Sequence, residues 1–249
     1  MLGEAVKSVQ ALLQSGKEYV CVMRLHAPAE PEHVLKVLRM FEDEVYQRPP
    51  LRAAVKRQLR TRRVYYIELL EIEGRNILFK IGCEGGTYIR KLCHDIGEVL
   101  GTGAHMQELR RTRAGPFTEE DESSVTLHEV AYYYGEWKEK GSMDALRRIV
   151  KPMENALVLL PAIVVRDSAV DALCHGANLT APGILTVDAD IMPGTLTAVY
   201  TLKGEAVALA VATRSTKEML SLNHGVVAAV KRVLMARGTY PKAWKTTER

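Results

Sequence analysis

The chain has 249 residues, of which 47% are hydrophobic and 26% are charged, and its formal net charge is +4. These values exclude a disordered chain, and the length allows one large domain or two, each able to bury a core. The sequence has no apolar run of about 18 residues, no basic and apolar leader, and no Cys-x-x-Cys pair among its cysteines. We therefore expect a cytoplasmic protein without a transmembrane helix, a zinc site or a disulfide framework.

The first third of the chain is predicted to alternate between helices and strands. Some segments repeat apolar residues at helical spacing, whereas others alternate apolar and polar residues as half-buried strands do. Tyr19 falls on the apolar side of one such strand. In chain order, the predicted elements are a helix over 2–13, a strand over 18–25, a helix from Pro31, and strands over 64–72 and 77–83 joined by a turn at Gly74-Arg75-Asn76.

A glycine pair, Gly85-Gly86, leads from the last of these strands into the next helix. The apolar stripe of this helix runs from Ile89 to Leu100, and Gly101 ends it. The following elements are predicted as a strand over 104–111 and helices over 130–139 and 144–150, the first of them after a capping-box pair of Thr126 and Glu129.

The pattern changes near Pro161 to short strands separated by turn residues. The predicted elements there are a helix over 169–174, ended by Gly176, and strands over 184–187, 196–202 and 207–212. This is the pattern of a small α+β unit. The sequence therefore predicts an α+β fold, with a mixed α/β domain over residues 1–155 and a small β-rich domain over 156–249.

Basic residues are concentrated in two stretches. The segment Arg48–Arg63 holds seven basic residues and no acidic one, and a second cluster consists of Arg110, Arg111 and Arg113. Acidic residues collect elsewhere, at 42–44 and 119–122, so we expect a local positive field. A solvated surface is the ordinary interpretation of one such cluster. Two of them favour a phosphate-backbone partner, because the guanidinium fork donates two parallel hydrogen bonds to phosphate.

The segment Gly85–Arg90 is the main candidate for a site. As a strand-to-helix turn it needs no further explanation, and it lacks the phosphate-loop pattern. A cation such as Arg90 is disfavoured at a helix N-terminus, however, so it indicates a carboxylate or phosphate nearby. Both interpretations stay open from these residues alone. For Tyr19 and His105, packing and structural roles are the simpler interpretations.

Several of these segments, in this order, resemble the TruB/dyskerin family of RNA pseudouridine synthases. The matching segments are Lys17-Glu18-Tyr19-Val20, residues 47–56, Gly86-Thr87-Tyr88-Ile89-Arg90, Gly103-Ala104-His105-Met106 and residues 109–117. Residues 161–245 resemble the PUA domain that follows the catalytic domain in this family. The resemblance covers nearly the whole chain and points to archaeal dyskerin homologues, the catalytic subunits of box H/ACA ribonucleoproteins.

The resemblance implies the pseudouridine synthase fold and the isomerisation of uridine in rRNA under a guide RNA, and it leaves guide-free action on tRNA open. The target base is flipped out, detached through nitrogen and rejoined through carbon. By resemblance, Tyr19 stacks on the flipped base and Tyr88 lies beside the base and sugar. Arg90 pairs with the catalytic aspartate, and Leu109 packs against the site. No metal or organic cofactor is implied.

RNA contacts are also implied by the resemblance. They fall on Arg48, Arg52, Lys56, Arg57, Arg60, His105, Arg110, Arg111 and Arg113 in the first domain, and on Gly176, Ala177 and Gly183 in the second. A helix cap and a turn would explain the last three equally well. In the family, the PUA domain anchors the ACA end of the guide RNA. The implied protein partners are a kink-turn-binding ribosomal-type protein, a small zinc-binding protein and a glycine-arginine-type β-barrel protein, and no membrane is implied.

One departure from the family concerns the nucleophile. The family aspartate lies in a Gly-Thr-Leu-Asp-Pro motif, which does not occur in this sequence, and Leu2–Ala5 aligns just after it. We expect the aspartate to precede Met1, and neither Glu4 nor Glu18 is placed to replace it. The alternatives are a catalytically inactive RNA-binding scaffold of the same fold and a stand-alone tRNA enzyme of bacterial type.

Overall fold

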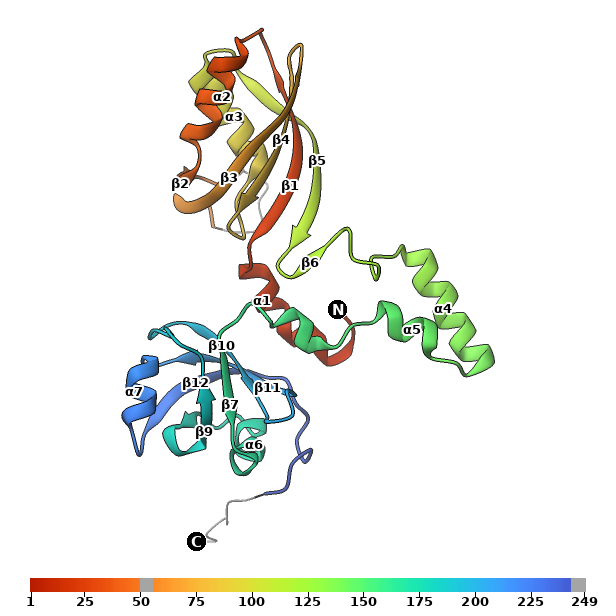
Figure 1. The fold of residues 1–249 in the computed structure, drawn as a ribbon, viewed down its shortest axis with the longest axis vertical. Helices are drawn as coiled ribbons and strands as arrows, with labels where there is room; N and C mark the ends of the chain where they lie inside the picture. The colour runs from red at the N-terminus through yellow and green to blue at the C-terminus, as the bar shows by residue number, and fades with distance from the viewer. Residues whose placement is uncertain (50–55, 243–249) are drawn as a thin grey trace. The chain divides into compact units, whose positions relative to one another are not determined.

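The chain folds around two six-stranded sheets, one in each of two compact units (Figure 1). The computed structural model describes residues 1–49 and 56–242. One unit, called the α/β unit, comprises Leu13–Ile149, and the other, the β-rich unit, combines Met1–Leu12 with the chain from Val150 onward. No helix among the described residues is both long enough and apolar enough to cross a membrane.

The sheet of the α/β unit has the strand order β2-β3-β4-β1-β5-β6, with antiparallel neighbours throughout. Its strands are β1 (Lys17–Leu25), β2 (Asp43–Gln47), β3 (Arg60–Glu73), β4 (Asn76–Cys83), β5 (Ala104–Ala114) and β6 (Phe117–Thr118). The predicted hairpin is the β3–β4 pair, which turns at Gly74 with a φ of 57°. Strands β2 and β6 have no counterpart in the sequence prediction, because each is too short to show a clear alternation.

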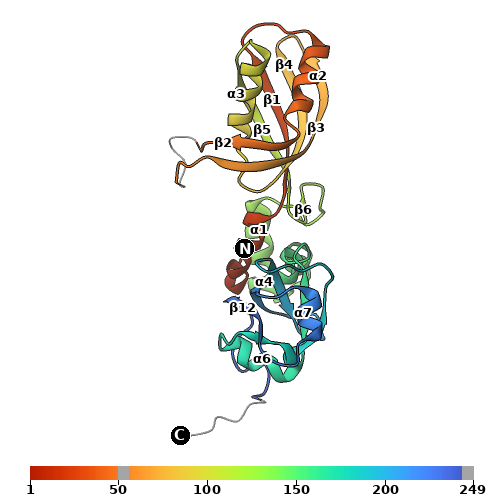
Figure 2. The same ribbon diagram turned by 90° about the vertical axis from the view of Figure 1, so that its left-hand side faces the viewer.

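Helices α2 (Pro31–Met40) and α3 (Ile89–Leu100) lie on the same face of this sheet (Figure 2). Their apolar residues form one core with the alternate residues of β1 that begin at Tyr19. The predicted first residue of each helix agrees with the structure within one residue. Pro31 is the first residue of α2, and the glycine pair comes shortly before α3. The face of the sheet that carries Tyr19 is therefore the face that α3 covers.

The helices α4 (Leu127–Lys140) and α5 (Asp144–Ile149) complete the α/β unit. The predicted capping box is present, because the side chains of Thr126 and Glu129 bond each other's backbone N–H groups. Neither helix has a buried residue among those described. Their stability therefore depends more on caps and on local ion pairs, such as that between Glu136 and Lys140, than on a core.

The β-rich unit has the strand order β8-β12-β11-β10-β7-β9, in which only the β10–β7 pair is parallel among the described strands. The strands are β7 (Ala162–Val165), β8 (Leu179–Thr180), β9 (Ile184–Val187), β10 (Leu196–Tyr200), β11 (Ala206–Ala212) and β12 (Val226–Val233). The helices are α6 (Asp167–Cys174), α7 (Thr216–Ser221) and the 3-10 turns η2 (Met153–Ala156) and η3 (Ala181–Gly183). The predicted fold class, α+β with a small β-rich second part, is confirmed.

The N-terminal residues differ from the prediction in two ways. Residues 2–13 were predicted as one helix, but they form a 3-10 helix, η1 (Gly3–Ser8), followed by α1 (Val9–Gln14). The Ala5 N–H donates to the Leu2 carbonyl at 3.1 Å, three residues back, as the tighter helix requires. Ala11 packs in a core with Leu157, so Met1–Leu12 group with the β-rich unit. The domain boundary that the sequence analysis places between residues 155 and 156 stays a prediction.

The close packing of α3 on β5 gives a test of the fold. A Cβ at Gly97 would lie 2.2 Å from the Ala104 nitrogen, whereas a Cβ at Gly135 in α4 would meet nothing within 4 Å. We expect Gly97→Ala to lower the free energy of unfolding by about 1–3 kcal/mol through overpacking. The matched change Gly135→Ala should raise it by up to about 1 kcal/mol through helix propensity. Urea unfolding monitored by circular dichroism measures both, and equal effects of the two changes would contradict the packing of α3 described above.

Candidate nucleic-acid interface

The turn from β4 to α3, residues Glu84–Tyr88, is held by close backbone packing. A Cβ at Gly85 would lie 2.3 Å from the Leu13 carbonyl oxygen, so only glycine fits there. Gly86 has a φ of 88°, which also favours glycine. The Thr87 hydroxyl donates to the Glu84 carbonyl at 2.8 Å and closes the turn. The turn therefore delivers Tyr88, the residue before the first turn of α3, at a fixed place.

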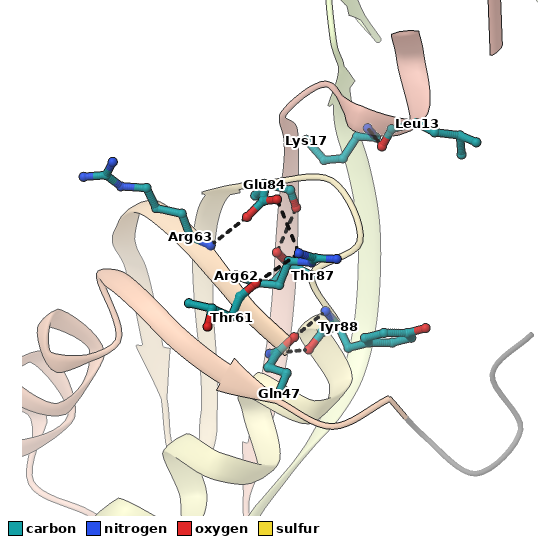
Figure 3. Close-up of polar contacts among 9 residues, drawn as sticks. All are labelled: Leu13, Lys17, Gln47, Thr61, Arg62, Arg63, Glu84, Thr87 and Tyr88. Carbon is teal, nitrogen blue, oxygen red and sulfur yellow. Dashed lines mark hydrogen bonds and ion pairs between the residues drawn. The ribbon is translucent and has the colours of Figure 1, made fainter. Parts of the chain in front are cut away.

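Strand β3 supports the same turn, because two of its residues donate hydrogen bonds to the carboxylate of Glu84 (Figure 3). The Glu84 carboxylate accepts from the Arg63 backbone N–H at 3.2 Å and from Arg62 Nη1 at 3.4 Å. The Arg62 guanidinium also lies against Gly86, about 3.4 Å from where a Cβ would be. Arg62 is thus occupied in supporting the turn and is not presented to a ligand.

Gln47, the last residue of β2, contacts Tyr88 through both ends of its side-chain amide. Its Oε1 accepts from the Tyr88 backbone N–H at 2.9 Å, and its Nε2 donates to the Tyr88 carbonyl at 3.2 Å. The amide is 2% exposed, and the Tyr88 ring extends away from it (Figure 3). Sequence reasoning gave Gln47 no role, because a polar residue at the end of an acidic strand gives no signal of burial.

A concave surface lies beside the start of α3. This cavity, of about 560 Å³, is lined by Tyr46, Arg48, Pro49, Arg57, Leu59, Arg90, Lys91 and His94. No carboxylate lines it among the described residues, and two of its basic side chains pair with acids on the same helix, Lys91 with Asp95 and His94 with Glu98 at 3.9 Å. Arg90 is exposed and has no hydrogen bond or ion pair within the described part of the chain. The cavity therefore presents a positive surface suited to phosphate.

Tyr19, Leu109 and Arg111 lie on one face of the sheet. Tyr19 is opposite Arg111 in the β1–β5 register and Cys21 is opposite Leu109, and the Arg111 guanidinium stands 5.3 Å from the centre of the Tyr19 ring. Leu109 is 40% exposed, so it is available to a ligand. The structure thus brings together three of the predicted residues as a cation and an aromatic ring next to an apolar side chain.

Two titratable groups lie near the turn, at the Lys17 end of β1. Burial, and after it the Arg111 guanidinium, lowers the pKa of Lys17. Burial raises the pKa of Cys83 to about 11, so its thiol is protonated at neutral pH. Cys83 is therefore unsuited to act as a nucleophile there. No three His, Cys, Asp or Glu side chains among the described residues group to hold a metal ion.

The predicted cluster Arg110, Arg111 and Arg113 is divided between the two faces of the sheet. A register shift between Glu18 and Tyr19 places Arg113 opposite Glu18, on the face away from Arg111. Arg110 is also on that face and pairs with Glu119 at 2.7 Å. Alternation along β5 and the bulge therefore separate arginines that are adjacent in sequence, and the RNA contacts expected at these three residues stay a prediction.

The expected separation of acidic from basic residues is also corrected in part. Strand β2 carries acidic residues and pairs with β3, so Glu44 lies opposite Arg63, and Arg63 pairs with Asp43 at 3.2 Å. Arg48 and Arg57 remain in the acid-free cavity, and Lys56 and Arg60 are linked by a bond from the Arg60 guanidinium to the Lys56 carbonyl. Arg52 lies outside the described residues.

His105 is remote from the other predicted residues. It begins β5 opposite Arg24, five residues along β1 from Tyr19, which corresponds to roughly 17 Å. Its Nδ1 lies 3.0 Å from Nε2 of His26. The structure therefore places His105 in a histidine pair at the far end of the strands and not at the cavity.

The three predicted residues of the β-rich unit have different surroundings. Gly176 follows α6 with a φ of 88° and lines a cavity of about 260 Å³ together with Lys7, His175 and Arg237. Ala177 is exposed beside it. Gly183 is buried, and a Cβ there would press on Ala169 and Leu179 at 3.2 Å. Gly183 therefore serves the packing of the unit, and the first two remain the candidates for contact with a ligand.

Comparison with family models and curated proteins matches nearly the whole chain. The model of the tRNA pseudouridylate synthase B C-terminal domain matches residues 90–158, the PUA domain model matches 161–234, and the model of the Pus10 C-terminal region matches 3–114. The "Probable tRNA pseudouridine synthase B" of Methanopyrus kandleri is 58% identical over 243 residues, which cover 98% of this chain and 71% of the relative. The protein of the same name from Methanosarcina acetivorans is 55% identical over 248 residues, covering 100% and 73%.

Solved structures give the same correspondence. A Cbf5 chain in a Cbf5–Nop10–Gar1 complex superposes with a TM-score of 0.92 at 53% identity, covering 97% of this chain and 73% of that one. A chain of an H/ACA ribonucleoprotein bound to a substrate RNA that contains 2′-deoxyuridine gives a TM-score of 0.88 at 49% identity, covering 98% and 73%. The likeness thus extends over both units.

The Glu18 carboxylate lies on the face of the sheet away from Tyr19, and its hydrogen bonds can be tested through the pH dependence of stability. The Tyr66 hydroxyl, and after it the Thr112 hydroxyl at 2.7 Å, donate to Glu18 and lower its pKa. Such a group stabilises the fold above the ordinary glutamate pKa, and the contribution is lost as pH falls through the lowered value. We expect Glu18→Gln to be less stable than the wild type at pH 7, with a difference that shrinks below about pH 4.

Urea unfolding from pH 7 to pH 3 measures this difference. The control is Glu71→Gln, an exposed carboxyl on β3 of the same sheet. A difference for Glu18→Gln that stayed constant across the pH range would show that these hydrogen bonds do not favour the ionised form.

Proposed function

Because the chain belongs to the TruB/dyskerin family of RNA pseudouridine synthases, we propose that it isomerises uridine to pseudouridine in RNA, as the catalytic subunit of a box H/ACA ribonucleoprotein that acts on rRNA under a guide RNA. The observation that carries the proposal is the acid-free positive cavity beside Tyr88 and Arg90. A positive concave surface binds phosphates whatever the base sequence, and the groups beside it act on the selected nucleotide.

The residues at the cavity have separate tasks in this proposal. Arg48 and Arg57 bind the phosphates around the target. The Tyr19 ring, which is buried apart from the cavity lining with the Arg111 guanidinium beside it, is the proposed stacking partner of the flipped base. Isomerisation breaks the bond from C1′ to nitrogen and forms a bond from C1′ to carbon of the same base. That carbon loses a proton and the released nitrogen gains one, so no atom is gained or lost overall. The enzyme's work is therefore to hold the base and sugar while the bond is exchanged.

Arg90 is the group proposed to hold the reacting carboxylate. It is an exposed cation at the positive end of a helix and has no ion-pair partner among the described residues. A carboxylate beside it would be kept ionised, as a nucleophile or base requires. The family's Gly-Thr-Leu-Asp-Pro motif is not among these 249 residues, so the proposal takes that aspartate as the partner of Arg90 without locating it.

Substrate and partners are proposed from the relatives. The curated relatives are named as tRNA enzymes, which favours tRNA modification as a second function. The similar Cbf5 chains were solved with Nop10 and Gar1, so we propose that corresponding small proteins, together with a kink-turn-binding protein, assemble on this chain in the cytoplasm. The cavity with Lys7, Gly176 and Arg237 is proposed to take the ACA end of the guide RNA. None of the named relatives supports an inactive scaffold.

The function is tested with the protein as its organism makes it, assembled with its partners. We expect pseudouridine in an rRNA fragment only when a matching guide RNA is present, measured by nucleoside mass spectrometry. Conversion of tRNA without a guide would assign the stand-alone activity. Retention of RNA binding with no conversion of either substrate would overturn the proposal and favour the scaffold alternative.

Arg90 and Arg57 line the same cavity and are predicted to respond differently to replacement by alanine. Arg90→Ala should lower turnover by about 10²–10³-fold, the cost of removing one charged group at a reacting centre, with RNA affinity little changed. Arg57→Ala should weaken binding and lower the slope of log affinity against log salt by about one, because one phosphate contact is lost. Single-turnover rates and filter binding at several salt concentrations separate the two. If RNA affinity fell equally in both variants, Arg90 would be a phosphate-binding residue and the role proposed for it would be wrong.

A further inference from the structure

We propose that Gln47 is a positioning residue, whose side-chain amide fixes the backbone of Tyr88 and thereby sets the start of α3, with Arg90, against the opposite wall of the positive cavity. This inference rests on the proposed function. It concerns a residue that touches no substrate and acts through the backbone of its neighbour. The evidence is the paired hydrogen bonds, their burial, and the position of Gln47 in the chain.

The hydrogen bonds join one donor and one acceptor on each partner. Gln47 Oε1 accepts from the Tyr88 N–H at 2.9 Å and Nε2 donates to the Tyr88 carbonyl at 3.2 Å. Tyr88 is the N-cap residue of α3, and no side chain of its own segment caps the helix. A tyrosine cannot supply the oxygen that usually caps a helix, so its conformation needs support from elsewhere. Among uncharged side chains, an amide is the group that donates and accepts in this way.

Gln47 also connects the two walls of the cavity. The next residues along the chain, Arg48 and Pro49, form one wall, and Arg90 and Lys91, just after Tyr88, form the other. Gln47 and Tyr88 are 41 residues apart in sequence, and β2 is an edge strand held by β3 alone within its sheet. The amide therefore provides a direct link from the end of β2 to the start of α3.

Three substitutions separate positioning from stability. Gln47→Leu keeps the volume and removes both hydrogen bonds. Gln47→Glu keeps the acceptor, but the ionised carboxylate faces the Tyr88 carbonyl without a donor, and protonation restores one. Val45→Ala is the control, because Val45 is buried on the same strand and its apolar side chain cannot hydrogen-bond the Tyr88 backbone, so its loss should destabilise β2 and leave the amide link intact.

The experiment measures kcat, KM and the unfolding midpoint on the assembled protein with guide and substrate RNA. We expect Gln47→Leu to lower kcat by about 10- to 100-fold, with KM within about twofold, because a small misplacement of reacting groups has this cost. Gln47→Glu should lose less activity at acidic pH than at neutral pH, relative to the wild type, and Val45→Ala should keep kcat. A normal kcat for Gln47→Leu, an equal fall for Val45→Ala, or an unaltered relative pH profile for Gln47→Glu would each overturn the inference.

A second measurement does not depend on activity. Hydrogen exchange of the Tyr88 amide should be at least about tenfold faster in Gln47→Leu than in the wild type, since its buried acceptor is gone, and unchanged in Val45→Ala. Unchanged exchange in Gln47→Leu would overturn the inference. If the wild type itself formed no pseudouridine, the proposed function would fail, and the exchange data would still decide whether Gln47 fixes Tyr88.

Discussion

The close approach of Gly85 to the Leu13 carbonyl is the constraint on which the candidate site depends. Any side chain at Gly85 would collide with backbone, which cannot move aside as a side-chain end can. The turn is therefore pressed against the segment that leads into β1, and β1 carries Tyr19. The turn also follows β4, which pairs with β1, so this backbone contact and the β1–β4 pairing together set Tyr19 and Tyr88 in place. The packing at Gly85 holds the middle of the turn, and hydrogen bonds hold its two ends, those of Glu84 at the β4 end and those of Gln47 at Tyr88.

Strand alternation decides which charges can act together. Arg110 and Arg111 are neighbours in sequence, yet the sheet separates them, and one bulge sends Arg113 to the side of Arg110. In the same way, Arg62 and Arg57 belong to one basic stretch but have different tasks. Arg62 lies on β3, where Glu84 holds it, whereas Arg57 precedes that strand and lines the cavity. A count of basic residues along the chain therefore overestimates the surface available to phosphate.

The sequence predicted the elements with a strong period or a clear boundary. Pro31 and Gly85-Gly86 mark α2 and α3, and the Thr126 and Glu129 pair marks α4, because each acts locally. Strand β2 was not predicted, since five residues with an acidic start show little alternation. The role of Gln47 could not be predicted either. Its burial results from pairing with a residue 41 positions away, and no local pattern encodes that distance.

The exposed cation at the start of α3 has a further consequence for the chemistry. The helix dipole opposes Arg90 by roughly 0.3–1 kcal/mol, a cost that local structure does not offset among the described residues. Arg62, a few ångströms from the same turn, is neutralised by Glu84, so a nearby carboxylate is present and yet is not shared with Arg90. The fold thus keeps one arginine paired for structure and leaves the other uncompensated. Under the proposed function, this uncompensated cation attracts the anionic group that the reaction needs, and it favours that group in its ionised form.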